Sequence, residues 1–247
     1  KGDGQDGVLG MPRFDAEMCD RRCQECAKVC PTSAIEVDID HFGKSHVTVD
    51  YGRCVVCQLC VEACPTGAAS GSQDVAVGVR DRADLVANGS RFHIARTRKR
   101  TESRDGFRRS LHIRHVDAGS CNGCESEIQA LNNPFYNLHR LGIFFTPTPR
   151  AADLLLVTGP VTYAMQVPLL QAYQAMPEPR WVMAVGTCAV SGGVAGGGYA
   201  CGTGLDGVIP VDLYLPGCPP NPAAMIEAFL MFLDRKPQRM KGGHIVE

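Results

Sequence analysis

The chain has 247 residues, of which 45% are apolar, and a formal net charge of −1. This length is enough for one large domain or two smaller ones. The longest apolar run near the C-terminal end, Ala223–Leu233, has eleven residues and contains Glu227, so no segment is expected to span a bilayer. Thirteen cysteines without a secretory signal argue against a disulfide framework and favour metal sites in a reducing compartment.

Eight cysteines in the first third of the chain form an internal repeat. Three cysteines and the Pro, Thr and Ala that accompany the last of them recur 34 residues later, which predicts two similar half-units facing each other. The second block reads Cys-x2-Cys-x2-Cys-x3-Cys-Pro from Cys54 to Pro65. In that spacing three thiolates bind one cluster, and the fourth, in the turn before proline, reaches a neighbouring cluster.

By that rule the two blocks exchange their last cysteine. One ligand set is Cys54, Cys57, Cys60 and Cys30, and the other is Cys19, Cys23, Cys26 and Cys64. The pattern resembles the bacterial-type ferredoxins with two [4Fe–4S] clusters, over residues about 12–75. The resemblance implies a small α+β domain.

Cys19 departs from the usual spacing, because three residues separate it from Cys23 where ferredoxins usually have two. The first turn must therefore bulge if Cys19 is a ligand; otherwise the ligand set differs. Zinc is the alternative metal, since four-cysteine zinc sites also use Cys-x2-Cys pairs. Zinc requires neither three closely spaced thiols nor a crossed-over Cys-Pro, so iron–sulfur clusters are favoured. Between the blocks, alternating residues in Ile35–Ile39 and Val47–Val49 predict a small hairpin.

A basic connector is predicted over residues about 76–110. From Arg91 to Arg114 the chain contains nine basic residues and few apolar ones, which is typical of a loop or arm. We expect this arm to dock on an acidic partner subunit or an anionic membrane surface; a merely solvated arm is the alternative. Nucleic acid is not expected, because the arm lacks the interleaved aromatic residues of single-strand binders.

The rest of the chain, residues about 111–240, alternates short apolar strands with helical or glycine-rich stretches. The predicted strands are Leu111–Val116, Gly142–Thr146, Asp153–Thr158, Trp181–Val185 and Val211–Leu215. This alternation predicts an α/β domain with a parallel sheet covered on both faces. Helices are expected over Pro160–Ala175, interrupted at Pro168, and over Pro222–Asp234, after a cap at Asn221.

Four cysteines follow three of these strands. Cys121 and Cys124 come after the first strand, Cys188 after the fourth and Cys218 after the fifth. In open parallel sheets ligands bind beyond the carboxyl ends of the strands, so we expect the four thiols to meet there. Four soft thiolates suit a third iron–sulfur cluster.

Three motifs carry a resemblance over residues about 111–235: Cys-Asn-Gly-Cys-Glu, Gly-Thr-Cys-Ala-Val-Ser-Gly-Gly and Pro-Gly-Cys-Pro-Pro-Asn-Pro. They look like those of the small subunits of membrane-bound [NiFe] hydrogenases of the formate hydrogenlyase type, relatives of the B subunit of respiratory complex I. The resemblance implies a flavodoxin-like α/β domain with one [4Fe–4S] cluster, pressed against a large subunit. The complex I subunit has adjacent cysteines where this chain has two residues between Cys121 and Cys124, which favours the hydrogenase branch.

Three features near these cysteines have two interpretations each. Glu125 suits the first turn of a helix, where negative charge is favoured; the resemblance also suggests that it joins a proton path to the partner's active site. Cys201 is left over when three clusters take twelve thiols, and is expected to be an inert buried thiol rather than a ligand. Gly202–Gly207 matches the dinucleotide fingerprint, but it neither follows a strand nor opens a helix, so we reject that function.

The sequence therefore predicts an oxidoreductase subunit that relays electrons through three [4Fe–4S] clusters to or from a catalytic centre in a large partner subunit. The resemblance implies further electron-transfer and membrane subunits, and a cytoplasmic position, peripheral on the inner face of the membrane. One alternative is a complex I-related assembly that uses quinone or another acceptor without nickel. Another is a non-catalytic iron–sulfur binding or scaffold protein, which would hold labile clusters and have no stable large partner.

Overall fold

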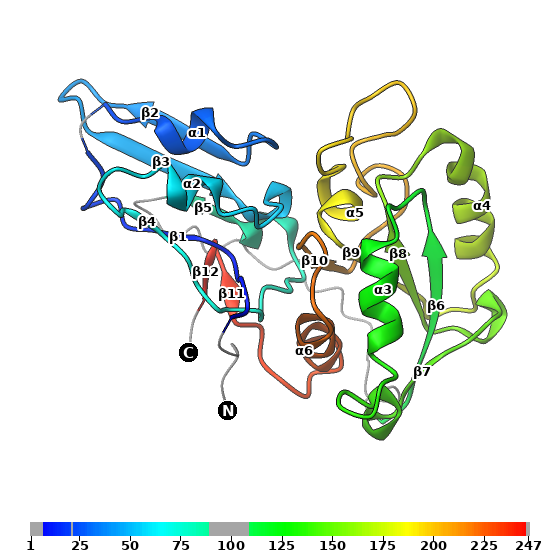
Figure 1. The fold of residues 1–247 in the computed structure, drawn as a ribbon. Helices are drawn as coiled ribbons and strands as arrows, with labels where there is room; N and C mark the ends of the chain where they lie inside the picture. Colours follow the sequence, from blue (N-terminus) through cyan, green and yellow to red (C-terminus); the bar gives the residue numbers. More distant parts are fainter. Residues whose placement is uncertain (1–6, 21, 89–108, 246–247) are drawn as a thin grey trace.

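The computed structural model describes residues 7–20, 22–88 and 109–245. Within these residues the chain forms two modules (Figure 1): a small one from the N-terminal part, and a larger one around a five-stranded sheet. The small module is blue to cyan in Figure 1 and the larger one green to orange, and the C-terminal hairpin, in red, returns to the small module.

Two short helices and small antiparallel sheets make up the small module. Its elements are β1 (Arg13–Phe14), α1 (Glu25–Lys28), β2 (Ile35–Ile39), β3 (Ser45–Asp50), the 3-10 helix η1 (Tyr51–Arg53), α2 (Leu59–Glu62) and β4 (Ala69–Ser70). β1 pairs antiparallel with β4, and β2 pairs antiparallel with β3. The predicted hairpin is confirmed, with Val37 opposite Val47. Buried residues alternate with partly exposed ones along β3, so one face of the hairpin covers the core.

The 34-residue repeat is visible in the backbone. Helices α1 and α2 begin and end 34 residues apart, and Arg22 and Val56, also 34 apart, both have a φ of 58°. Positive φ is uncommon for a residue other than glycine, so its recurrence indicates two copies of one backbone turn. The copies diverge just before the helices, where Gln24 has a φ of −135° and Gln58 a φ of 63°.

The larger module contains a parallel sheet with the strand order β10-β9-β8-β6-β7. Its strands are β6 (Leu111–Asp117), β7 (Ile143–Phe145), β8 (Leu154–Thr158), β9 (Trp181–Val185) and β10 (Leu213–Leu215). All neighbouring strands run parallel. The predicted α/β fold with a parallel sheet is confirmed, and each predicted strand is present with its ends shifted by at most two residues.

Four helices accompany this sheet: α3 (Gly123–Ala130), α4 (Tyr163–Gln174), α5 (Thr187–Ser191) and α6 (Pro222–Phe232), with two 3-10 turns, η4 (Leu138–Leu141) and η5 (Pro149–Ala151). α6 begins as predicted, because the Asn221 side chain accepts a hydrogen bond from the Ala224 N–H at 2.8 Å. The expected interruption of α4 at Pro168 is wrong, since the helix runs through it. Proline removes one helical hydrogen bond, and the fully buried Leu169 next to it anchors the helix by packing.

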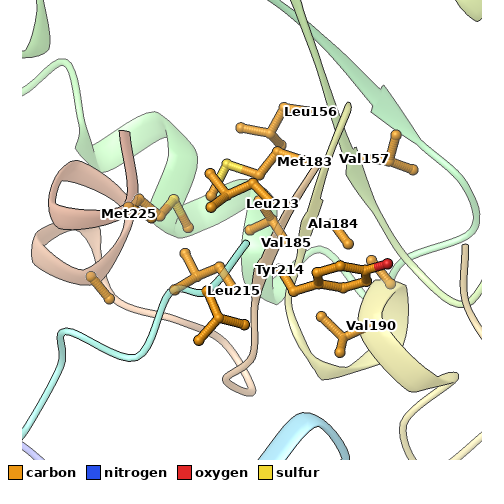
Figure 2. Close-up of a cluster of buried hydrophobic side chains, with 14 of the residues drawn as sticks. Leu156, Val157, Met183, Ala184, Val185, Val190, Leu213, Tyr214, Leu215 and Met225 are labelled. Atoms are coloured by element: carbon orange, nitrogen blue, oxygen red, sulfur yellow. The ribbon is translucent and has the colours of Figure 1, made fainter. Parts of the chain in front are cut away.

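The core lies on both faces of the sheet. Every residue of β8 and β9 is buried, as expected when both faces are covered. Figure 2 shows the core around the edge strand β10, with Leu213 and Leu215 on the side of Met225 from α6. Tyr214 points to the opposite side, toward Val190 from α5. Side chains alternate along a strand, so α5 and α6 lie against opposite faces of β10.

Two sets of hydrogen bonds join the modules where the chain leaves the small one. Val79 pairs with Tyr214 of β10 through two backbone hydrogen bonds, of 2.9 and 2.8 Å. Arg80 then donates to the carbonyl of Met231 at 2.6 Å and forms an ion pair with Asp234. The segment after β4 therefore lies along the free edge of the five-stranded sheet.

The chain returns twice to the small module. After Arg80 it forms the 3-10 helix η2 (Arg82–Leu85) and β5 (Val86–Asn88), which pairs with β3. The C-terminal hairpin of β11 (Met240–Lys241) and β12 (His244–Ile245) packs beside η2. Most of the predicted basic connector, residues 89–108, lies outside the described residues. Within the described part of the chain, no helix is both long and apolar enough to cross a membrane.

Candidate metal centres

Four cysteines from both halves of the repeat line one cavity of the small module. They are Cys30, Cys54, Cys57 and Cys60. The walls of the cavity include the apolar side chains of Pro31, Ile35 and Val49. Three of the thiols come from the loop before α2 and from α2 itself, and the fourth comes from the turn before β2. The structure therefore brings together the four residues that the Cys-Pro crossover groups as one ligand set.

The other four cysteines of the repeat line a second cavity. They are Cys19, Cys23, Cys26 and Cys64. This cavity is close in size to the first, and Phe14, Val47 and Ala68 contribute its apolar walls. Cys19 lies here despite the extra residue before Cys23. The hydroxyl of the buried Ser45 lies 3.2 Å from the carbonyl oxygens of both Asp20 and Cys23, which share its one proton.

Backbone N–H groups point at several of these sulfurs. The two crossover cysteines have equivalent donors, because the Ala34 N–H lies 3.3 Å from Cys30 Sγ and the Ala69 N–H 3.3 Å from Cys64 Sγ. Burial opposes ionisation of Cys64, but hydrogen bonds from Ala69 and its neighbours hold its pKa below the ordinary value. Such donors stabilise the thiolate, which is the form that binds metal.

Three further thiols of the small module resist ionisation. Burial raises the pKa of Cys54 to about 12 and those of Cys26 and Cys60 to about 11, and repulsion from neighbouring thiolates adds to the effect. At pH 7 these thiols are therefore neutral. A group that binds them as thiolates must bring enough positive charge to displace the protons, as iron does.

The third group of cysteines gathers beyond the carboxyl ends of the strands of the parallel sheet. Cys121 and Cys124 follow β6, Cys188 lies in α5 directly after β9, and Cys218 follows β10. Burial raises the pKa of Cys124 to about 12 and that of Cys188 to about 11; Cys218 and Cys121 are among the charges that raise both further. The four thiols thus interact with one another. Cys121 and Cys218 are exposed, whereas Cys124 and Cys188 are partly buried.

Two glycines allow the backbone to pass close to these sulfurs. A Cβ on Gly186 would lie 2.6 Å from Cys124 Sγ, and one on Gly193 would lie 2.9 Å from Cys188 Sγ. Both glycines have positive φ, of 86° and 59°, which other residues adopt only with strain. The glycines therefore serve the packing around the third group of thiols.

Glu125 belongs to a partly buried hydrogen-bonded network beside Cys124. Its carboxylate accepts hydrogen bonds from the hydroxyl of Ser120, at 2.7 Å, and from that of Thr158. His115 Nε2 lies 2.9 Å from Thr158 Oγ1 and 3.5 Å from Glu125 Oε1. Burial lowers the pKa of His115, although the nearby Glu125 opposes this. Glu125 also stands in the first turn of α3, where negative charge is favoured.

The sequence alone gives no sign that His115 takes part in this network. Alternation along a strand only places it on the opposite face from His112. The structure keeps the two apart: His112 stacks on Phe144, whereas His115 faces Thr158. Its pairing with Glu125 depends on the register of β6 against β8, in which His115 is opposite Leu156, and no local pattern reveals that register.

Cys201 and the glycine-rich segment follow α5, and Cys201 lies close enough to Cys188 to help raise the pKa of that thiol. Cys201 is buried, and its Sγ donates to the Ala195 carbonyl at 2.9 Å. In the segment Gly202–Gly207, Gly204 packs on α5, since a Cβ there would lie 2.7 Å from the Ala189 carbonyl oxygen. The segment is followed by a turn and not by a helix, so the context that a dinucleotide site requires is absent there.

Known proteins match both modules. Residues 18–68 match a 4Fe-4S dicluster domain, and residues 121–232 match the family described as NADH ubiquinone oxidoreductase, 20 Kd subunit. A probable membrane-bound hydrogenase subunit of Pyrococcus furiosus is 40% identical over 134 residues, which cover 54% of this chain and 80% of that protein. The chain belongs to this family of oxidoreductase subunits.

Two further similarities are found among known proteins. Formate hydrogenlyase subunit 7 of Escherichia coli is 45% identical over 134 residues, so the chain covers 52% of that protein, about half its length. A solved structure of the membrane-bound sulfane sulfur reductase, an archaeal respiratory membrane complex, contains a chain 34% identical, with a TM-score of 0.48 over 53% of this chain and 72% of that one. The predicted resemblance to hydrogenase small subunits, joined to a two-cluster ferredoxin domain, is confirmed.

The residues present fit [4Fe–4S] clusters. Each group offers four thiols, the soft donors that such clusters require. In the small module the thiols surround a cavity with apolar walls, and N–H donors lie at hydrogen-bond distance from sulfur. Among the described residues no three His, Cys, Asp or Glu side chains converge on a point that could hold one metal ion.

Proposed function

We propose that the chain relays electrons, one at a time, through three [4Fe–4S] clusters to or from a catalytic centre in a large partner subunit. The observation that carries the proposal is the grouping of cysteines that are far apart in the sequence. In the small module, two cavities of similar size are each lined by four thiols, with Cys30 and Cys64 crossing between the halves of the repeat. That crossing is the ligand pattern of two adjacent clusters.

The ligand sets follow from this grouping. The first cluster takes Cys19, Cys23, Cys26 and Cys64; the second takes Cys54, Cys57, Cys60 and Cys30; the third takes Cys121, Cys124, Cys188 and Cys218. Each cluster, when bound, supplies a one-electron couple whose potential depends on hydrogen bonds to sulfur and on burial. The residues of this chain supply both: the N–H groups of Ala34 and Ala69 donate to sulfur, and apolar walls keep water from the thiolates.

The catalytic partner docks over the third set of cysteines. Cys121 and Cys218 are exposed at this edge. The loop after α5 begins next to Cys188, at Gly193, and it presents Val194, 69% exposed, and the fully exposed Tyr199. The same loop is tied to the start of α4 by a hydrogen bond of 3.0 Å from the Tyr163 N–H to the Ala200 carbonyl. Exposed apolar side chains gathered at one place mark interaction sites, so a large subunit of a hydrogenase or complex I-like assembly covers this surface.

Further electron-transfer and membrane subunits complete the assembly. The chain then lies at the cytoplasmic, inner face of the membrane as a peripheral subunit. Support comes from the relative named as a probable membrane-bound hydrogenase subunit and from the excess of basic residues in the connector, which suits an acidic partner or an anionic membrane surface.

Glu125 forms part of a proton path to the partner's active site. Support comes from the continuous hydrogen bonds that join its carboxylate to Ser120, Thr158 and His115. Such a chain of donors and acceptors conducts protons to the partner only when it reaches the interface. Cys121, close to Glu125 in the sequence, is exposed where the partner docks.

A quinone- or other acceptor-linked assembly without nickel is the second candidate. It is favoured by the family description, NADH ubiquinone oxidoreductase, 20 Kd subunit. The hydrogenase assignment is favoured by the identity of 45% with a formate hydrogenlyase subunit. Nickel ligands belong to the partner, so the large subunit decides between the two.

Purification of the tagged chain from its own organism under anaerobic conditions tests the proposal. Mass spectrometry of the co-purifying proteins and metal analysis are the measurements. A large subunit with two Cys-x2-Cys pairs and bound nickel supports the hydrogenase; the same subunit without these pairs supports the quinone-linked assembly. Recovery of the chain alone, with iron that is lost on gel filtration, would show a cluster scaffold and contradict the relay.

A further inference from the structure

One threonine contacts the backbone of two other cysteine-bearing loops. Thr187 is the first residue of α5, directly before Cys188, and its side chain is 1% exposed. Its hydroxyl donates to the carbonyl oxygen of Cys54 at 2.8 Å and accepts from the Gly217 N–H at 3.1 Å. The Thr187 N–H also donates to the Gly217 carbonyl at 2.9 Å. A single side chain thus joins the loops of Cys54, Cys188 and Cys218.

These loops belong to different cysteine groups and to different modules. Cys54 lines the cavity with Cys30, Cys57 and Cys60, whereas Cys188 and Cys218 belong to the third group. The other hydrogen bonds described above between the modules, at Val79 and Arg80, lie on segments without cysteine. Among the hydrogen bonds of the described residues that cross between the modules, that of Thr187 connects two cysteine loops directly.

The Cys54 side of this contact is held rigidly. Cys54 follows the 3-10 helix η1, which packs on α5. The Asp50 side chain accepts from the Gly52 N–H at 2.9 Å and from the Arg82 guanidinium at 2.7 Å. Gly52 leaves the space for Arg82, because a Cβ there would lie 2.3 Å from the guanidinium carbon. The carbonyl that Thr187 contacts is therefore presented by a turn with little freedom.

We propose that Thr187 is the positioning residue that couples the two modules electronically, by fixing the Cys54 loop against Cys188 through its hydroxyl. This inference rests on the proposed relay. An electron that passes between the groups that Cys54 and Cys188 would hold would oxidise one of them and reduce the other, in either direction. No covalent bond forms or breaks, and the Thr187 proton remains on its oxygen. The site of Cys54 is then the one through which the small module exchanges electrons with the larger one.

Replacement of the hydroxyl tests the inference in the full-length, cluster-loaded chain. Thr187→Val keeps the shape of the side chain but leaves the Cys54 carbonyl and the Gly217 N–H unpaired, whereas Thr187→Ser keeps the hydroxyl. We expect the Val variant to retain its iron but to slow electron transfer between the modules about tenfold or more, since small misplacements of reacting groups reduce rates steeply. Pulse reduction followed by absorbance measures that rate, and the Ser variant is expected to remain near the parent.

Two readouts separate positioning from a merely structural role. Amide hydrogen exchange at Gly217 should accelerate in Thr187→Val and not in Thr187→Ser. In electron paramagnetic resonance of the fully reduced chain, the magnetic interaction between the second and third clusters should weaken in Thr187→Val alone. An unchanged rate and interaction in a Val variant whose Gly217 amide exchanges faster would overturn the inference. A parent chain without iron would instead refute the relay itself.

If Thr187→Val loses its iron, two other variants test whether the second ligand set is the one coupled to the third. They replace cysteines at equivalent positions of the repeat. Cys57→Ala removes a ligand of the second set and Cys23→Ala the equivalent ligand of the first. The magnetic interaction with the third cluster should disappear in Cys57→Ala and persist in Cys23→Ala. The reverse result would show that the Thr187–Cys54 contact does not connect the coupled sites.

Discussion

The cysteine groups of the small module and of the sheet edge differ in how far this chain encloses them. Of the eight thiols in the small module, Cys57 is the exposed one; in the third group both Cys121 and Cys218 are exposed. The small module builds its two sites from a repeat, so each half supplies a wall for the other. The third group depends on three separate loops at one edge of the sheet. An enclosed site keeps its group away from solvent, whereas an open one is suited to a neighbouring subunit that completes it.

The largest expected effect in this comparison comes from removing one ligand of the open site. Cys188→Ala should lose the third cluster, about four of roughly twelve irons, while the two signals of the small module remain. Iron analysis and electron paramagnetic resonance of the purified variant are the measurements. Cys201→Ala is the matched control, because Cys201 is also a cysteine of this module but donates to the Ala195 carbonyl; it should keep all three signals.

Loss of every signal in Cys188→Ala would show that the two regions do not fold as separate cluster-binding units. Loss of a signal in Cys201→Ala would instead place that cysteine in a ligand set.

A smaller effect is expected from crowding the third site without removing a ligand. Ala at Gly186 or at Gly207 must adopt positive φ, of 86° or 82°, which costs about 1–2 kcal/mol in either place. Only at Gly186 would the new Cβ also lie 2.6 Å from a sulfur, Cys124 Sγ; at Gly207 nothing lies within 4 Å. The temperature of thermal unfolding should therefore fall in both variants. The electron paramagnetic resonance signal of the third cluster should change in Gly186→Ala alone. Equal spectra for the two variants would contradict a cluster bound at Cys124.

The smallest effect concerns the exposed edge itself. Tyr199→Asp places a charge on the proposed docking surface and should weaken binding of the large subunit about tenfold, or about 1.4 kcal/mol. Phe42→Asp is the control, since Phe42 is 88% exposed on the small module. Quantitative mass spectrometry of proteins that co-purify with each tagged variant measures the difference. If Phe42→Asp reduced the amount of co-purifying large subunit more than Tyr199→Asp does, the docking surface would have to be assigned to the small module.

Local patterns were enough to predict most of the two regions. The strands, the hairpin Ile35–Ile39 with Val47–Val49 and the cap at Asn221 follow from side-chain periodicity and backbone preferences, which act over a few residues. The gathering of Cys121, Cys124, Cys188 and Cys218 follows from one further rule, that parallel strands end at the same edge.

Features set by tertiary packing could not be predicted in this way. The passage of α4 through Pro168 is decided by the packing of the helix. The pairing of His115 with Glu125 depends on the register of β6 and β8, and the contact of Thr187 with Cys54 joins residues 133 apart in the sequence. None of these features leaves a periodic or spacing signal in a single sequence. Each depends on how separate helices, strands and loops pack together in the fold.

The identity of the bound metal tests the central claim most directly. The chain, purified and kept without oxygen, should be brown and should contain about twelve irons with matching sulfide, the content of three cubanes. Stepwise reduction followed by electron paramagnetic resonance should resolve three one-electron components. A colourless protein with zinc in place of iron would contradict the relay.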